Sequence, residues 1–146
     1  KRPMGLSQLI YTSTCTDVMT SKMAYQVSCQ SVSVCEQLGL TGRVFANNWQ
    51  ALAMTEGPTE IVRQYFEAVS ADVLVETTLL HYDRPIETRE FSDYSVWLNL
   101  GEGFEFGEKV RRLTEQSVKE ALPAYPSAKL KIMATAYLQG DMLAVA

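Results

Sequence analysis

Histidine and cysteine are scarce in this chain of 146 residues, which contains one histidine and three cysteines. The cysteines (Cys15, Cys29 and Cys35) are odd in number and form no C-x-x-C pair. The sequence therefore predicts neither a disulfide framework nor a zinc site. Reduced thiols in a cytoplasmic protein are the simplest interpretation. His81 has no ligand cluster near it, which is typical of a surface or packing residue.

A basic excess and a long apolar run are also missing. Lys and Arg number 13 against 17 Asp and Glu, and this net charge of −4 argues against a nucleic-acid-binding surface. No apolar stretch is long enough to cross a bilayer, and the N-terminus shows no apolar segment of the signal-peptide type. We therefore expect a cytoplasmic protein that binds neither nucleic acid nor a membrane.

What is present fits an ordinary globular domain. Apolar residues make up 47% of the chain and charged residues 21%. Period-two alternation and helical spacing predict elements in the order βαββαββ. Their expected ranges are a strand over 7–13, a helix over 21–38, a hairpin of 43–46 with 49–55, a helix opened by Gly57-Pro58, and strands over 73–82 and 94–98.

This order indicates an α+β fold, a ferredoxin-like mixed sheet with two helices on one face. Within the first helix, Met23, Val27, Val34 and Leu38 fall on one face. Beyond residue 101, two apolar stripes predict a C-terminal helical pair, one from Val110 to Ala121 and one from Leu130 to Leu138. We expect an α+β domain over residues 1–100 and a helical extension packed on the sheet over residues 101–146.

Five short motifs follow one another at fixed spacing. They are LIYTS at 9–13, LTG at 40–42, EGP at 56–58, Asp72, and REFSDYSV at 89–96. In this order they resemble the BLUF domain, a family of flavin-binding blue-light sensors. The family pattern runs without a gap from about Leu6 to Val96. The resemblance implies the same βαββαββ fold, with a flavin slot between the two helices.

The resemblance also implies which residues would form that slot. In the family, a tyrosine on the first strand and a glutamine on the third form a hydrogen-bonded chain to the flavin, and an asparagine on the first helix holds the polar edge of the ring. Tyr11 matches the tyrosine, whereas Cys35 stands at the asparagine position and Ala53 at the glutamine position. Tyr94 and Val96 stand where the family has a tryptophan and a methionine.

These replacements change the expected function. Ala53 has no hydrogen-bonding side chain, and the thiol of Cys35 is only a weak donor. Each unsatisfied flavin carbonyl costs about 1–3 kcal/mol, so two losses weaken binding roughly a hundredfold. We therefore expect a signalling or protein-interaction module that has lost flavin binding and the photocycle. It would need no cofactor, would not be an enzyme, and would act through a protein partner or a homo-oligomer.

Two alternatives stay open. The first is a blue-light photoreceptor that keeps FAD in an altered site. A three-residue shift would bring Gln50 to the glutamine position, although Gln50 and Ala53 then lie on opposite faces of the strand. The second is an enzyme like the acylphosphatases, whose related fold needs an arginine and an asparagine around a phosphate. No such cradle is apparent in the sequence.

Overall fold

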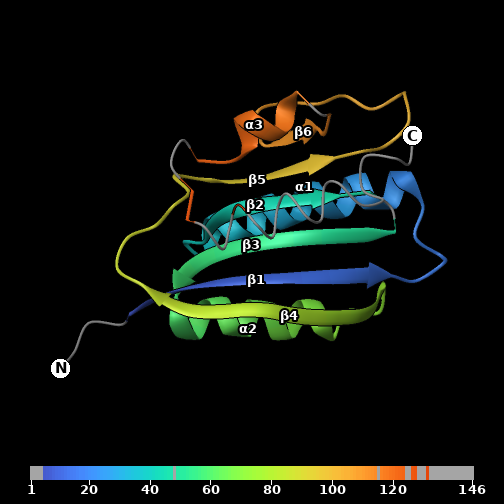
Figure 1. Ribbon diagram of the computed structural model, residues 1–146. Helices are drawn as coiled ribbons and strands as arrows, with labels where there is room; N and C mark the ends of the chain where they lie inside the picture. The colour runs from blue at the N-terminus through green and yellow to red at the C-terminus, as the bar shows by residue number, and fades with distance from the viewer. Residues whose placement is uncertain (1–4, 48, 115, 124–125, 128–130, 132–146) are drawn as a thin grey trace.

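The computed structural model describes residues 5–47, 49–114, 116–123, 126–127 and 131. In chain order the elements are β1 (Leu6–Cys15), α1 (Ser21–Gln37), β2 (Thr41–Ala46), β3 (Gln50–Pro58), α2 (Thr59–Ser70), β4 (Val75–Ile86), β5 (Tyr94–Leu98), β6 (Val110–Arg112) and α3 (Ser117–Ala121). The predicted βαββαββ order is confirmed from β1 to β5 (Figure 1). Among these residues, no helix is long and apolar enough to span a membrane.

The strands form one mixed sheet in the order β4-β1-β3-β2-β5-β6. The pairs β1–β3, β1–β4 and β2–β3 are antiparallel, whereas β5 and β6 are added in parallel. Alternate residues enter two different apolar cores. Tyr11 and Ala53 belong to the core that also contains side chains of α1 and α2, and Leu52 belongs to the core on the other face. Both helices therefore cover one face, as predicted, and lie behind the sheet in Figure 1.

Local signals fix the ends of α1 within a residue of the prediction. Thr20 rather than Ser21 caps the helix, since its hydroxyl accepts a 3.1 Å hydrogen bond from the Met23 amide. At the other end Gly39 has a φ of 73°, a left-handed conformation that glycine adopts without strain. The amide of Leu40 then donates to the Cys35 carbonyl at 2.9 Å, which directs the chain into β2.

The buried face of α1 differs from its most apolar face. The side chains that the helix buries are Ala24, Ser28, Val32 and Cys35. Val27 and Val34, which the spacing placed on the apolar face, remain 37% and 44% exposed. Both valines line a cavity beside the helix, whereas Leu38, on the same predicted face, is 40% exposed without lining it. The apolar spacing thus identified residues that the sheet does not cover.

The C-terminal stripe also begins differently from the prediction. Val110–Arg112 is a short strand, in which Val110 pairs with Val96, and not the first turn of a helix. Helical structure begins only at Ser117. Val110 and Leu113 are three residues apart, a spacing that fits a helix face as well as a strand followed by a turn. The second stripe, from Leu130 to Leu138, falls outside the described residues except for Lys131.

Two glycines of the sequence motifs allow the strands to pack closely. Gly42 on β2 has a φ of 155°, and a Cβ atom there would lie 2.0 Å from the carbonyl oxygen of Met54. A Cβ on Gly57 would lie 2.4 Å from the Leu40 side chain. The motifs LTG and EGP therefore correspond to backbone positions that hold β2 against β3 and the α1–β2 turn against β3.

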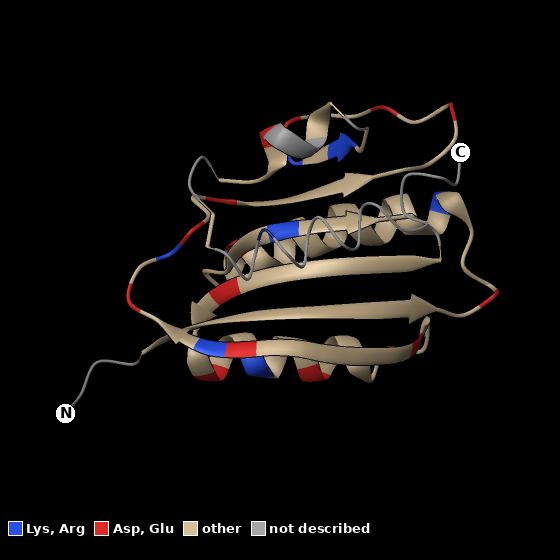
Figure 2. Ribbon diagram, viewed as in Figure 1, with Lys and Arg blue, Asp and Glu red and all other residues tan. Residues whose placement is uncertain are grey.

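Glu56 is the only charged residue on β3, and Arg43 is the only one on β2 (Figure 2). The Glu56 carboxylate is fully buried. It accepts hydrogen bonds from the Gln8 amide at 2.9 Å and from the Thr41 hydroxyl at 3.2 Å. The backbone amides of Glu90 and Phe91 also donate to it, at 2.9–3.1 Å. Glu56 thereby fixes the β4–β5 connection to the centre of the sheet.

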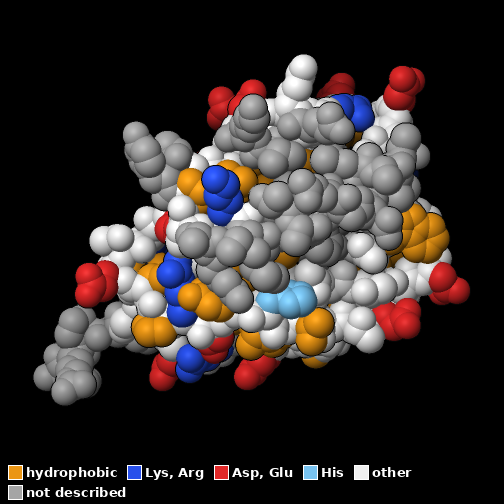
Figure 3. Space-filling model, viewed as in Figure 1, with side chains coloured by type: hydrophobic (Ala, Val, Ile, Leu, Met, Phe, Trp, Pro, Cys, Tyr) orange, Lys and Arg blue, Asp and Glu red, His pale blue; other side chains and the backbone are white. Residues whose placement is uncertain are grey.

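One edge of the sheet is the long strand β4, whose pairing with β1 is irregular. Tyr82 pairs with Ile10 but Leu80 pairs with Tyr11, so His81 is the extra residue of a bulge. The chain's single histidine is exposed on the face shown in Figure 3. A second register shift follows near the start of the strand.

Candidate functional site

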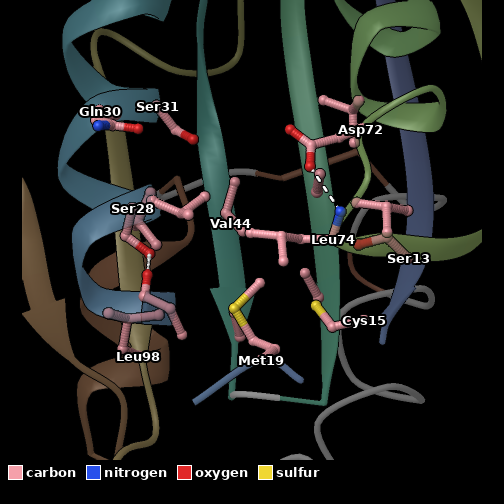
Figure 4. Close-up of a pocket in the computed structure, with 18 of the residues that line it drawn as sticks. Ser13, Cys15, Met19, Ser28, Gln30, Ser31, Val44, Asp72, Leu74 and Leu98 are labelled. Atoms are coloured by element: carbon pink, nitrogen blue, oxygen red, sulfur yellow. Dashed lines mark hydrogen bonds between the residues drawn. The ribbon is translucent and has the colours of Figure 1, made fainter. Parts of the chain in front are cut away.

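A cavity of about 320 Å³ lies between α1, α2 and the sheet. Its walls are mostly apolar, with a few hydroxyl groups and amides. Figure 4 shows Val44 of β2 in the middle of this region, with Ser28 and Ser31 of α1 on one side and Asp72 and Leu74 on the other. Its size and apolar character are those of a small-molecule site.

The structure brings together four of the five residues predicted from the motifs. Tyr11, Ala53, Tyr94 and Val96 all line the cavity. Tyr11 of β1 is the direct cross-strand partner of Ala53 of β3. On the other side of Ala53, β2 carries Val44, which pairs with both Ala53 and Val96. Ala53, directly opposite Tyr11, therefore offers only a methyl group, whereas Thr55, two residues along β3, lies within hydrogen-bonding reach of the Tyr11 hydroxyl.

Cys35, the fifth predicted residue, is fully buried but does not line the cavity. Its thiol lies within hydrogen-bonding reach of the Tyr65 and Tyr94 hydroxyls, both of which belong to cavity-lining residues. Burial raises the pKa of the thiol, and the contacts with the two hydroxyls partly offset this. A protonated thiol behind two phenols is not poised as a nucleophile.

The three phenols of the cavity are held in the neutral form. Burial raises the pKa values of Tyr11, Tyr65 and Tyr94 well above that of a free phenol. The ring of Tyr11 also packs edge-on against Phe66 of α2, with centroids 4.8 Å apart. At neutral pH these groups present hydroxyls that donate or accept hydrogen bonds, and no charge.

The register of β3 decides on which face of the sheet Gln50 lies. Gln50 pairs with Thr14, three residues along the strand from the Tyr11–Ala53 pair. Because side chains alternate along a strand, Gln50 points to the face opposite Ala53, and it is not among the residues lining the cavity. The shifted alignment would therefore require β3 to turn over.

Tyr65 is the site residue that sequence reasoning missed. In the sequence, Tyr65 shares its helical spacing with the apolar residues Ile61, Phe66 and Val69, which is typical of a packed helix face. A tyrosine within such a stripe carries a hydroxyl that needs a partner when buried, and in the structure that partner set includes Cys35 and Ser31. The tyrosine hydroxyl was therefore the one sign in the sequence that this face of the helix contacts polar groups.

The electrostatics of the cavity are set by one carboxylate. Asp72 is the only charged side chain among the lining residues that the structure describes. One of its oxygens accepts a 2.8 Å hydrogen bond from the Leu74 amide. Leu74 and Val75, which stand where the resemblance places an arginine and a histidine, line the cavity as apolar residues. Over the same described residues, no cluster of His, Cys, Asp or Glu could hold a metal ion.

Comparison with solved structures gives the fold. BlrP1 of Klebsiella pneumoniae, solved with calcium and cyclic diGMP, matches at a TM-score of 0.71 and 17% identity, covering 92% of this chain and 34% of that one. The BLUF protein BlrB in its dark state matches at a TM-score of 0.60 and 20% identity, covering 96% and 90%. BlsA in its photo-activated state matches at 0.62 and 16%, covering 97% and 96%. This chain thus spans about a third of the BlrP1 chain.

Comparison of sequences gives the family. No curated protein sequence matches this chain. The family model of BLUF, described as sensors of blue light using FAD, matches residues 6–97. This range agrees with the motif pattern expected from about Leu6 to Val96, and it spans more than half of the sequence. The chain therefore belongs to the BLUF family of blue-light-sensing signalling modules.

Proposed function

We propose that this protein is a BLUF-fold signalling module that works through protein contacts without a bound flavin. The observation that carries the proposal is the Tyr11–Ala53 pair, in which a methyl group faces the tyrosine from the neighbouring strand. A methyl group neither donates nor accepts a hydrogen bond. At this position β3 therefore cannot pass a hydrogen bond from the phenol to a ring in the cavity, and Thr55, the β3 side chain within hydrogen-bonding reach of the Tyr11 hydroxyl, does not line the cavity.

The rest of the lining supports the same proposal. A flavin presents an apolar ring, which the walls of the cavity suit, and a polar edge that needs well-placed donors and acceptors. Asn47 contributes an amide to the lining, but its side-chain oxygen accepts from the amides of Trp49 and Gln50 in the β2–β3 turn.

The direct test is the absorption spectrum of the purified protein. We expect a colourless protein without the blue absorption band of a flavin. A yellow protein whose band shifts to the red on illumination would overturn the proposal and favour a photoreceptor with an altered site. A yellow protein without such a shift would contradict the absence of flavin but support the loss of the photocycle.

A matched pair of variants tests the part played by Ala53. Ala53→Gln places an amide in the cavity opposite Tyr11, whereas Leu79→Gln adds the same amide at a position of β4 that is 60% exposed and outside the cavity. After reconstitution with FAD, we expect higher affinity for Ala53→Gln than for the wild type. Leu79→Gln should match the wild type. Equal affinity in all three proteins would show that Ala53 does not limit flavin binding.

The protein-contact part of the proposal has a separate test. Two structural neighbours are much longer chains: BlrP1 and a bacterial light-regulated adenylyl cyclase, of which this chain covers 34% and 33%. We infer that the present module likewise transmits its state to another protein or to a second copy. Light scattering combined with gel filtration, and affinity capture from the native cell, should find a stable assembly. A monomer that captures nothing would count against it.

A further inference from the structure

We propose that the cavity between α1 and α2 binds an uncharged, mainly apolar small molecule that accepts a hydrogen bond. This inference rests on the proposed absence of flavin and assigns the vacated volume a different class of ligand. Three features of the walls support it: exposed apolar side chains, neutral hydroxyl groups, and the lack of a lysine or arginine among the described lining residues.

The apolar walls are incompletely packed. Val27 and Val34 of α1 line the cavity and keep 37% and 44% of their surface exposed. Protein interiors are normally packed as densely as organic crystals, and apolar surface left uncovered forgoes the free energy of burial. An apolar molecule in this cavity would cover both valines together with Val44 of the sheet. The walls thus favour a ligand with a hydrocarbon or aromatic body.

The polar groups in the cavity are hydrogen-bonding and neutral. Tyr11, Tyr65 and Tyr94 reach it from three different elements, β1, α2 and β5. Their burial favours the protonated phenol, which both donates and accepts hydrogen bonds. Within the protein these hydroxyls lie near Thr55 and Cys35, so a ligand oxygen would join or replace these contacts. Ser31 of α1 adds a further hydroxyl on the same lining. This set suits a ligand with a carbonyl, hydroxyl or ether oxygen.

The lining offers no positive charge to an anion. No lysine or arginine lies among the described lining residues, and the one lining carboxylate, Asp72, belongs to an exposed residue. An anionic group inside the apolar cavity would lose its hydration without gaining a cation in return. Binding an uncharged molecule there is therefore more favourable than binding an anion.

The cavity lies next to three converging loops with exposed apolar side chains. The backbone amide of Cys15 donates to the Trp49 carbonyl at 2.7 Å, and that of Thr16 donates to the Leu74 carbonyl at 2.9 Å. These two bonds connect the end of β1 to the β2–β3 turn and to the α2–β4 turn. Trp49 is 50% exposed and Val73 is 89% exposed. These side chains give an apolar ligand a surface to contact before it enters.

The test compares two probes with the same ring system and different charge. The probes are 2-naphthol, which is uncharged at neutral pH, and 2-naphthalenesulfonate, which is anionic. We expect 2-naphthol to bind with a dissociation constant below about 1 mM, and the sulfonate to bind at least tenfold more weakly. Calorimetry gives the affinities, and backbone amide shifts locate the site. Equal affinity for both probes would overturn the charge argument.

Matched variants show whether the probe is in the cavity. Val27→Trp fills the space from α1, whereas Leu79→Trp adds the same side chain on β4, at a position that is 60% exposed and outside both the lining and the entry loops. We expect the first to abolish 2-naphthol binding and the second to leave it unchanged. If Val27→Trp unfolds the protein, Tyr65→Phe serves instead. It should weaken 2-naphthol binding roughly two- to tenfold and leave naphthalene binding unchanged.

The two proposals fail in different ways. Flavin bound to the purified protein contradicts the proposed function by itself. A colourless protein that binds neither naphthalene nor 2-naphthol contradicts only the ligand proposal. Binding that survives Val27→Trp in a folded protein would place the probe elsewhere and would also overturn it.

Discussion

The Glu56 carboxylate shows how a single residue can account for a sequence motif. Its donors come from β1, from the start of β2 and from the β4–β5 connection. Glu90, in the middle of that connection, accepts from the same Gln8 amide at 2.6 Å and pairs with Arg84 at 3.0 Å. The motif glutamate therefore organises a buried polar network on the sheet, away from the cavity.

Removing this carboxylate should be costly. Glu56→Ala leaves the backbone amides of Glu90 and Phe91 without the carboxylate that accepts from them. We expect the free energy of unfolding to fall by about 3 kcal/mol, since each buried donor left unsatisfied costs on the order of 1–3 kcal/mol. Urea unfolding followed by circular dichroism measures the change. The exposed Glu67→Ala on α2 is the control and should stay within about 0.5 kcal/mol of the wild type.

Between elements, the close approach of β2 to β3 leaves no room for a side chain at Gly42. Gly42→Ala would place a methyl group 2.0 Å from the Met54 carbonyl oxygen, a backbone atom that cannot rotate away. We expect a loss of at least about 2 kcal/mol of stability. Gly101→Ala, where a Cβ meets nothing within 4 Å, is the matched control. Similar melting temperatures for both variants would show that the two strands separate readily.

Asp93 joins β6 to the rest of the sheet. It contacts Lys109 at 2.7 Å and Arg43 at 2.8 Å. The hydrogen bond from Lys109, with the charge of Arg43, holds the pKa of Asp93 below its ordinary value of 3.8, although burial opposes this. A lowered pKa in the folded state contributes stability that is present above the unfolded-state pKa. It is lost as the pH falls through the folded-state pKa.

The expected result is a pH-dependent difference between the wild type and Asp93→Asn. Above about pH 5 the wild type should be more stable, by no more than about 1 kcal/mol because the carboxylate is 39% exposed. The difference should shrink steadily below pH 4. Urea midpoints measured from pH 2.5 to 7 give the curve. A difference that is constant across this range would mean that the ion pairs do not stabilise the fold.

The elements themselves could largely be predicted from the sequence. Period-two alternation located β1 and β5, and Gly39 and Pro58 marked where helices end and begin. The strand β6 was missed because three residues carry too little periodicity to distinguish it from a helix. The apolar face of α1 differs from its buried face because the spacing of Val27, Val34 and Leu38 does not show whether another element covers them. The pairing of Tyr11 with Ala53 was implied by the resemblance to the family. The position of Cys35 behind Tyr65 depends on side-chain packing, which spacing does not determine.

At the scale of the whole molecule, the residues that hold the family fold differ from the residues at the positions of the family's flavin site. The motifs that match the family are explained by backbone contacts and a buried carboxylate, and these hold the fold whatever fills the cavity. The departures from the family are concentrated where the strands face the helices. Fold and cofactor chemistry therefore impose different requirements on this chain.

Melting temperatures measured with and without ligand test whether the folded chain still binds the cofactor of its family. A ligand that binds only the folded state raises stability in proportion to the logarithm of its concentration over its dissociation constant. We expect the melting temperature to be unchanged by 100 μM FAD and raised by 2-naphthol at concentrations above its dissociation constant. A rise of several degrees with FAD would mean that the altered cavity still holds the cofactor.

The two margins of the sheet limit how a partner can attach. A long open strand normally invites another chain to extend the sheet through main-chain hydrogen bonds. Here β4 is interrupted by its bulge at His81 and a second register shift, and the opposite margin, β6, is only three residues long. Neither offers a regular template for strand addition. Partners of this protein should therefore recognise it by its side chains and loops, and its concentrated solutions should resist the formation of cross-β fibres.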